Sequence, residues 1–243
     1  MRSMRKPIFI LLFVLFSVSQ GTQAHTTFRT EPLPEKTPQE IINDYIDAIG
    51  GKQKIAAVKT IILVMEAEIQ GMKIGFEIDT NRDMEGLRLM QQMVVDGNVM
   101  QKTVVKDNEG YMSMMGQVKT LSEDELATLK TNIYAFPEMH YGDMGFSVTR
   151  GENTTINGEE AYTLLVTNSA GLESKEYFSI ASGLKLKMVA EVAGDIIFDD
   201  YEEVEGIMFP MKVTISNPML PVPMETRVVS IQVNEPLDNS LFE

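Results

Sequence analysis

Cysteine is absent from the 243 residues, and histidine occurs only as His25 and His140. Disulfides, thiolate zinc sites, iron–sulfur ligation and cysteine nucleophiles are therefore excluded, and a centre of three imidazoles cannot be built. No Gly-Xaa-Ser-Xaa-Gly elbow, phosphate loop, dinucleotide fingerprint or calcium loop occurs. Glu66 and Glu68 could act as acid and base, but a solvated outer strand face explains them better. The sequence predicts no catalytic residues, no cofactor and no enzyme.

Positive charge is also scarce, because 35 Asp and Glu face 21 Lys and Arg, for a formal net charge of −14. Loss of Arg2, Arg5 and Lys6 with a signal peptide would make the net charge −17. Such a chain repels phosphate backbones, and no run of Lys and Arg offsets this, so nucleic acid is excluded as the main partner. The content of 44% hydrophobic and 23% charged residues is typical of a globular protein.

Long hydrophobic runs are limited to one, at residues 8–18. It follows three basic residues and precedes small residues that end at Ala24, which predicts a signal peptide at 1–24 with cleavage near Ala24. Eleven helical residues span about 16 Å, too little for a hydrocarbon core of about 30 Å, which disfavours the alternative of an uncleaved anchor. We expect an exported protein that is soluble after cleavage, with a flexible lead at 25–36, one domain at 37–243 and no transmembrane segment in the mature chain.

Capping chemistry predicts two helices. Thr37 with Glu40 forms a capping box before a helix over 37–50, and Ser122 with Glu125 forms another before a helix over 122–130. Alternating hydrophobicity predicts strands at 60–69, 72–79, 87–95, 98–106, 111–117, 146–150, 153–156, 161–167, 172–180, 184–192, 196–203, 208–216 and 224–233. Tight turns are predicted at Asp96-Gly97, Asn108-Glu109-Gly110, Asn157-Gly158 and Glu205-Gly206.

Strands 87–95 and 111–117 are apolar on both faces, so we expect cover on both sides of this part of the sheet. The pattern predicts a mainly β protein with helices (α+β). We expect a single curved antiparallel sheet of about ten to twelve strands, or an incomplete β-barrel, with both helices on the concave face.

Residues 131–145 form an aromatic, Met-containing loop. Loops this long and apolar are usually lids or partner surfaces. We expect the loop to pack down without cargo and to open at Gly142 and Gly145, and the alternative is a static loop that only caps the barrel. The predicted lid residues are Ile133, Tyr134, Phe136, Met139, Tyr141, Gly142, Met144 and Gly145.

The 18 methionines suit a surface that accepts apolar partners of variable shape, although core packing is the commoner role of a strand methionine. Together with the apolar loop and the lack of catalytic groups, they predict a non-enzymatic carrier or binder of an apolar ligand. The alternative is a structural or partner-binding envelope module with a filled core. The predicted cavity lining is Leu63, Met65, Phe76, Met112, Met114, Tyr134 and Phe136.

Copper binding is a more remote alternative. Cleavage after Ala24 would leave the amine and imidazole of His25 as chelators, and the thioethers of Met112, Met114 and Met115 suit Cu(I). The sequence shows no further ligands for such a centre, so no metal site is predicted.

Several segments resemble the periplasmic outer-membrane lipoprotein-sorting (LolA-like) group, and most closely its divergent branch from Bacteroidetes-type bacteria. The first match is Tyr-Ile-Asp-Ala-Ile-Gly-Gly at 45–51, followed by 57–60. The second is Gly-Tyr-Met at 110–112, followed by 121–125, and the third is Tyr-Phe at 177–178, followed by 182–184. The last two are the stretch that begins at 200–201 and continues to 206–210, and residues 236–242. Together they span about residues 37–243. Similar modules occur fused to insulinase-type zinc peptidases, without the catalytic residues.

The resemblance implies an incomplete antiparallel β-barrel with helices plugging its concave side and an apolar cavity that shelters acyl chains. The implied location is the periplasm. The implied partner is a lipid or a lipoprotein acyl chain, and an envelope protein is a second expected partner. The family also uses a basic residue near the cavity to govern cargo release, and the resemblance does not assign this role to Arg82 or Arg88.

Overall fold

The computed structural model describes residues 35–69, 72–191, 193–217 and 222–243, with the backbone alone at 69, 72–76, 124 and 128. Residues 36–243 form one compact unit, to which the description below applies. The predicted signal peptide and nearly all of the flexible lead lie outside the described residues. Among the described helices, none is long and apolar enough to cross a membrane.

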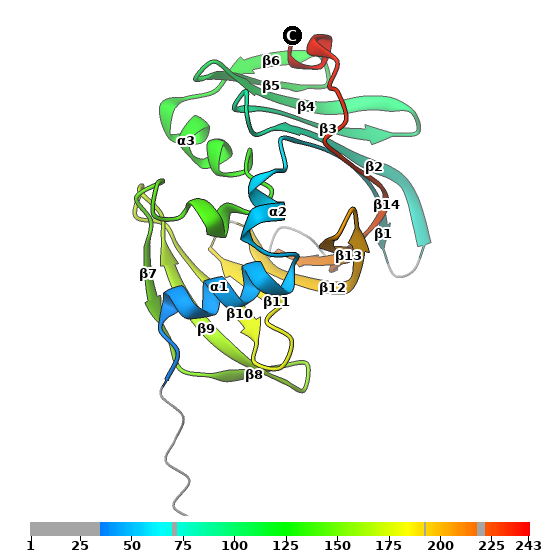
Figure 1. Ribbon diagram of the computed structural model, residues 1–243. Coiled ribbons are helices and arrows are strands. Elements are labelled where there is room, and N and C mark those ends of the chain that lie inside the picture. Colours follow the sequence, from blue (N-terminus) through cyan, green and yellow to red (C-terminus); the bar gives the residue numbers. More distant parts are fainter. Residues whose placement is uncertain (1–34, 70–71, 192, 218–221) are drawn as a thin grey trace, which may run out of the picture. The chain divides into compact units, whose positions relative to one another are not determined.

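Fourteen strands and a few short helices make up the described chain (Figure 1). The helices are α1 (Pro38–Ala48), α2 (Lys52–Ala56), α3 (Glu123–Thr131) and the 3-10 helices η1 (Pro137–His140) and η2 (Asn239–Phe242). The strands are β1 (Thr60–Ile69), β2 (Met72–Asp83), β3 (Arg88–Val95), β4 (Asn98–Lys106), β5 (Glu109–Met114), β6 (Gln117–Thr120), β7 (Ser147–Arg150), β8 (Thr154–Ile156), β9 (Glu159–Thr167), β10 (Glu173–Ser179), β11 (Lys185–Ala190), β12 (Gly194–Val204), β13 (Ile207–Ser216) and β14 (Met224–Val233).

All strands belong to one antiparallel sheet, in the order β6-β5-β4-β3-β2-β1-β14-β13-β12-β11-β10-β9-β7, with β8 paired to β9. The sheet curves strongly, and within the described residues its order ends at β6 and β7 without closing into a barrel. This confirms the predicted fold class. The described strands number fourteen, more than the expected ten to twelve.

Both predicted helices lie on the same, concave face of the sheet (Figure 1). Ile61, Arg82, Leu89 and Val105 are neighbours across β1, β2, β3 and β4, so their side chains share one face. On that face, Ile61 packs in the cluster that α1 forms with β9, β10 and β13, while Leu89 and Val105 pack with α3. Both capping boxes form as predicted, at the start of α1 and of α3.

The convex face of β3–β5 has its own cover at the C-terminus. Phe242 of η2 is buried against Met90 of β3 and Val104 of β4, with Leu237 and Leu241 beside it. The guanidinium of Arg88 stands 4.4 Å from the centre of the Phe242 ring. The expected two-sided cover is therefore present, with α3 on one face and the C-terminal segment on the other.

Two sequence predictions in this region are wrong in detail. Residues 111–117 do not form one strand, because Met115 and Gly116 adopt positive φ and fold the chain into the β5–β6 hairpin. The preceding turn lies at Asp107 and Asn108 rather than at 108–110. Gly110 is a strand residue, and a Cβ there would stand 2.7 Å from the Leu121 side chain, so the glycine permits close packing of α3 rather than a turn.

Candidate functional site

The predicted strand residues of the cavity lining share the concave face. Leu63 and Met112 lie on one row across the sheet, joined by Thr80, Gln91 and Thr103. A second row joins Met65 to Met114 through Ile78, Met93 and Gln101. Phe76 pairs with Ala67, but its side chain lies outside the described part of the structure. The register thus brings these positions to one face, while Met112 packs near α3 and Met114 at the far edge is 51% exposed.

A further apolar row crosses the other half of the concave face. Its members are Met224 on β14, Ile215 on β13, Ile196 on β12 and Met188 on β11, each paired with the next. These side chains are half-buried and belong to none of the three buried clusters of the described chain. The same row continues through Glu176 to Leu164, which is fully buried under α1. The concave face therefore has a packed part and a half-buried apolar part.

The 131–145 loop is packed against the concave face. Ile133, Phe136 and Tyr141 are buried, and Met139 and Met144 pack on the cluster around α1. Tyr134 is half-buried and stacks on His140 with ring centres 4.2 Å apart. The predicted hinge residues Gly142 and Gly145 are exposed, and a Cβ on either one would meet nothing within 4 Å. The apolar side chains of the loop therefore pack toward the sheet, whereas Gly142 and Gly145 have no close neighbours that would restrict them.

Three hollows border this loop and its immediate continuation. One of about 290 Å³ lies beside α2 and Met84 and is lined by Tyr134, Phe136 and Met139. A second of about 240 Å³ shares Tyr134 and lies near Val105. The largest, about 780 Å³, lies between α1 and residues 138–148. Of the predicted lining residues, Tyr134 and Phe136 thus border hollows beside the loop rather than the strand rows.

A buried charged cluster fixes the loop to the sheet. Glu138 of η1 pairs through Oε1 with Nζ of Lys185 at the start of β11, and Lys185 Nζ also lies 2.9 Å from Oε2 of Glu176 on β10. The Tyr141 hydroxyl donates a 2.6 Å hydrogen bond to Oε1 of Glu176. These side chains are almost fully buried. The Lys185 ammonium also faces the rings of Tyr45 and Phe178, at 5.8 and 5.3 Å.

Burial sets the direction of the pKa shifts in this cluster. Desolvation raises the pKa of Glu138, and the nearby Glu176 adds to this, while Lys185 opposes it. Desolvation likewise raises the pKa of the Tyr141 and Tyr45 hydroxyls. For Lys185, desolvation lowers the pKa, but the two carboxylates outweigh it and raise the pKa of the ammonium well above its usual value. Lys185 therefore stays charged at all ordinary pH values.

A basic residue on the concave face also contacts the loop. Arg82 on β2 donates from Nε to the backbone carbonyl of Asn132, at 2.9 Å. Desolvation by burial lowers the pKa of this guanidinium to about 10. The carbonyl that accepts its hydrogen bond carries no negative charge and so does not offset the desolvation. Arg88, in contrast, pairs with Asp83 at 2.5 Å, at the β2–β3 end of the sheet. Of these two arginines, Arg82 is the one that holds the loop.

Sequence reasoning missed the charged cluster, because Glu138 and Lys185 are 47 residues apart. One local signal was available. Glu176 and Phe178 are two residues apart in β10, so their side chains lie on the same face of the strand. That face is buried, and Glu176 places a carboxylate on it. A charge on an apolar strand face requires a buried partner.

Among the described residues, no group of three His, Asp or Glu is placed to hold a metal ion. His25 lies outside the described residues. Met112 packs near α3, and Met115 at the tip of the β5–β6 hairpin is 76% exposed.

The fold resembles several solved structures at low sequence identity. A LolA superfamily protein from Nitrosomonas europaea superposes with a TM-score of 0.58 at 13% identity, over 86% of this chain and 98% of that one. A DUF1329 family protein from Desulfovibrio piger gives 0.57 at 12% identity over the same shares. A domain from Vibrio parahaemolyticus named for outer membrane lipoprotein sorting gives 0.54 at 12%, over 84% and 94%.

No family model and no curated protein matches the sequence. The likeness to the three solved structures shows that the chain shares the fold of LolA-like proteins.

Proposed function

We propose that this protein is a non-enzymatic carrier or binder of an apolar ligand, namely a lipid or the acyl chains of a lipoprotein. The observation that carries the proposal is the row of half-buried apolar side chains at Met188, Ile196, Ile215 and Met224, outside the packed clusters. An acyl chain laid on this row would leave water, which contributes about 0.8 kcal/mol per buried CH₂. The row crosses four strands and spans about 14 Å at roughly 4.8 Å per strand step, so part of a long acyl chain can lie along it.

The cellular setting is part of the same proposal. We infer a signal peptide at 1–24, a flexible lead at 25–36 and a periplasmic domain at 37–243, within the divergent Bacteroidetes-type branch. The sequence motifs and the LolA-like fold support this setting.

The 131–145 loop would act as the lid. Its apolar residues pack down without ligand. Three polar contacts among the described residues hold it: Arg82 with Asn132 at its start, Glu138 with Lys185 in η1, and Tyr141 with Glu176. Hydrogen exchange of the loop with and without a fatty-acyl ligand tests this. We expect faster exchange than in the flanking strands and added protection on binding, and equal protection in both states would leave the loop as a static cap.

Matched variants test the ligand site. Ile196 faces the concave side, whereas the adjacent Ile197 of the same strand faces the opposite side, and both are half-buried. We expect Ile196→Asn to weaken binding of a pyrene-labelled fatty acid about tenfold or more, because an amide beside an acyl chain loses its hydrogen bonds to water. Ile197→Asn should bind as the parent does. Equal loss in both variants would contradict the concave site.

The rival function is a structural or partner-binding envelope module without ligand. The packed part of the concave face, with α1 seated on β9 and β10, favours this interpretation for that half of the sheet. Native mass spectrometry and lipid extraction of the protein from its own envelope separate the two functions. Co-purified lipid or lipoprotein supports the carrier, and a protein partner without lipid supports the module.

A further inference from the structure

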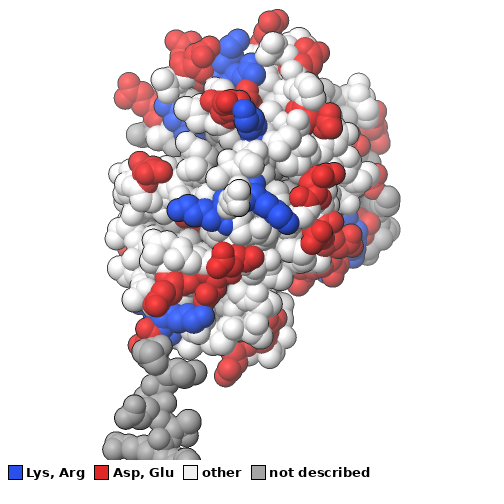
Figure 2. All heavy atoms as spheres, in the orientation of Figure 1, with Lys and Arg blue, Asp and Glu red and all other residues white. Residues whose placement is uncertain are grey.

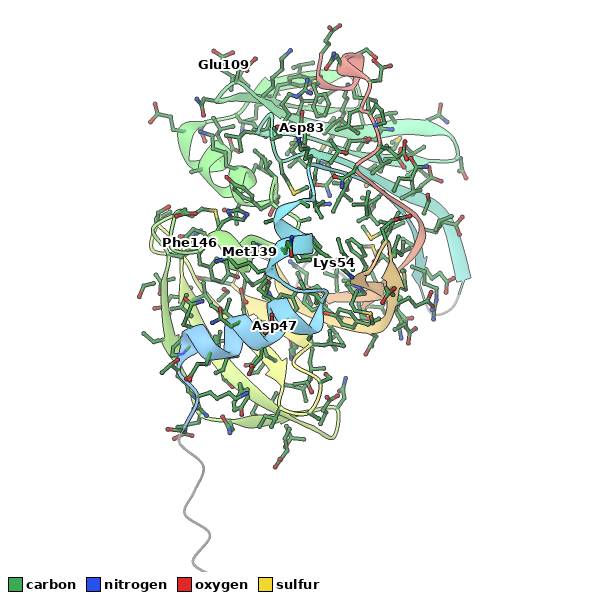
Figure 3. All side chains as sticks on the ribbon, viewed as in Figure 1. Asp47, Lys54, Asp83, Glu109, Met139 and Phe146 are labelled. Atoms are coloured by element: carbon green, nitrogen blue, oxygen red, sulfur yellow. The ribbon has the colours of Figure 1, made fainter. Side chains whose placement is uncertain are left out.

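Arg82, near the end of β2, places a positive charge on the concave face without a carboxylate partner among the described residues. Its Nε donates to the carbonyl of Asn132, but no described residue accepts a hydrogen bond from Nη1 or Nη2. The neighbouring Asp83, labelled in Figure 3, marks this end of β2, and its carboxylate is engaged by Arg88. Guanidinium groups that lose water on folding are normally paired with an anion. One side of the Arg82 fork is therefore unused.

The unused nitrogens of Arg82 can be reached from solvent. The side chain is half-buried, and its hydrogen bond to Asn132 lies at an exposed position. Some side-chain atoms of the described chain are both fully buried and unpartnered, as is Oγ1 of Thr163, but the Nη atoms of Arg82 are not among them. Because these two atoms lack a partner, they must retain accessible surface. A ligand atom can therefore approach the guanidinium.

Polar side chains adjoin Arg82 on the same face. Thr80 lies two residues before it, and the cross-strand neighbours of Thr80 are Gln91 on β3 and, beyond it, Thr103 on β4. Nε2 of Gln91 lies 3.5 Å from Oγ1 of Thr80, which is a long and weak hydrogen bond. Diagonal neighbours on adjacent strands lie about 7–8 Å apart, within reach of side chains as long as Arg and Gln. The guanidinium, the amide and the hydroxyls form a donor set that suits the oxygens of a carboxylate or a phosphate.

Apolar side chains follow one step farther along the same face. Met65, Ile78 and Met93 form the row that lies two residues beyond Thr80, and all three are half-buried. At about 3.3 Å per residue, Ile78 lies about 13 Å from Arg82 along β2. The concave face thus changes along this strand from charged through polar to apolar. This order matches an amphiphile with an anionic head and an apolar chain.

The charges around this end of the sheet also favour an anion. α2 carries Lys52 and Lys54 and no acidic residue, and Figure 2 shows Lys and Arg side chains gathered over α2. α2 and Met84, which is two residues after Arg82, both line the hollow of about 290 Å³. Glu85 also lines this hollow, but Lys59 pairs with it. The local charge is therefore positive, although the chain as a whole is acidic.

We propose that Arg82, together with Gln91 and Thr103, binds an anionic head group of the ligand, a carboxylate or a phosphate, while the apolar chain lies along Ile78 and Met93. This inference rests on the proposed function and deepens it, because it names the head group of the carried lipid. A neutral lipid would leave the guanidinium without an anion, and a cationic lipid would be repelled. The acyl chains of a lipoprotein are joined through uncharged ester and amide groups, so the site favours a free anionic lipid.

Four probes with the same ten-carbon chain and different heads test the site in the mature chain. Sodium decanoate and monodecyl phosphate are anionic, decanol is neutral and decylammonium is cationic. By calorimetry at pH 7, below micellar concentrations, we expect both anions to bind at least tenfold more tightly than decanol, because they accept charge-assisted hydrogen bonds. Non-specific attraction to a chain of net charge −14 would instead favour decylammonium.

The probes also separate this inference from the proposed function. Equal binding of decanoate and decanol would overturn the anion site and leave the apolar site standing, whereas no binding of any probe would contradict both. Inorganic phosphate should bind far more weakly than decyl phosphate, since it lacks the chain. Equal affinity of the two phosphates would reduce the site to one for a free ion and overturn the proposal.

Variants test whether Arg82 is the source of the preference. Arg82→Gln should weaken decanoate binding at least tenfold, to the level of decanol, and Arg82→Lys should retain most of the affinity. The matched control is Arg227→Gln, which removes the same charge from the convex face, where the Arg227 side chain is 49% exposed. Full affinity in Arg82→Gln, or an equal loss in Arg227→Gln, would overturn the proposal.

A second variant applies should Arg82→Gln not fold. Gln91 is half-buried, so Gln91→Leu keeps the volume of the side chain and removes one hydrogen-bond donor. We expect it to weaken decanoate binding about threefold without weakening decanol binding. An equal change for both probes would place the head group elsewhere and overturn the proposal.

Discussion

The two parts of the concave face differ in packing although both belong to the same sheet. Leu164 and Phe178 are 0% and 1% exposed beneath α1, whereas Met188 and Ile196, one or two strands away, are half-buried. Sequence composition does not separate the parts, since both are apolar. The difference lies in what packs on them, because α1 and the 131–145 loop contact the first part. One part therefore stabilises the fold, and the other is the part on which the proposed ligand would lie.

Cavity-forming substitutions should give the largest contrast between the two parts. Phe178 is fully buried and meets the Tyr45 ring edge-on at 5.3 Å, so Phe178→Ala should lower the free energy of unfolding by about 4 kcal/mol. Ile215 is half-buried, so Ile215→Ala should cost only about 1 kcal/mol. Urea denaturation measures both. Similar losses would show that the half-buried part also contributes to the core.

The charged cluster lies within the packed part, so its removal should also be costly. Lys185→Met leaves Glu138 and Glu176 buried without a cation, and we expect a loss of about 3 kcal/mol in the free energy of unfolding. The matched control is Lys187→Met on the same strand, since Lys187 pairs with Asp195 nearer the surface and should cost less than about 1 kcal/mol. A small loss for Lys185→Met would show that the ammonium contributes little to the stability of this cluster.

Glycine contacts give a smaller contrast, between the packed sheet edge and the loop. A Cβ at Gly110 would stand 2.7 Å from the Leu121 side chain and 2.8 Å from the Val104 carbonyl oxygen, so Gly110→Ala should cost about 2 kcal/mol. A methyl group at Gly142 would meet nothing within 4 Å, so Gly142→Ala should change stability by less than about 0.5 kcal/mol. Thermal unfolding of both variants checks this. A large effect at Gly142 would indicate that the loop needs its backbone freedom.

Local chemistry explains which parts of the fold could be predicted. The capping boxes of α1 and α3 involve residues three apart, and the turns at Asp96-Gly97, Asn157-Gly158 and Glu205-Gly206 depend on adjacent residues with positive φ. The β5–β6 turn at Met115-Gly116 has the same glycine signal but lies in an apolar run, which concealed it.

Features that depend on contacts between distant segments could not be predicted in this way. Register placed Leu63 and Met65 on the concave face as expected, because alternation is local. Which part of that face is covered depends on the packing of α1 and the loop, and no pattern within a single strand encodes it. The pairing of Glu138 with Lys185 has the same origin.

The smallest expected effect is a pH dependence of stability that arises from Glu138. Burial raises the pKa of this carboxyl above the 4.5 of an unfolded chain, so the folded state binds the proton more tightly. Its contribution to stability is fully present below about pH 4.5 and is lost as the pH rises through the raised pKa. Glu40 and Asp238 act oppositely at lower pH, because hydrogen bonds from the backbone lower their pKa.

The difference between the parent and Glu138→Gln isolates the Glu138 effect, since all other carboxylates are common to both proteins. We expect the free energy of unfolding of the parent to fall relative to that of the variant as the pH rises above 4.5, and then to level off. Urea denaturation at half-unit intervals from pH 4.5 to pH 8 measures this difference. A constant difference across that range would mean that Glu138 keeps one protonation state throughout, so that the buried cluster does not respond to pH.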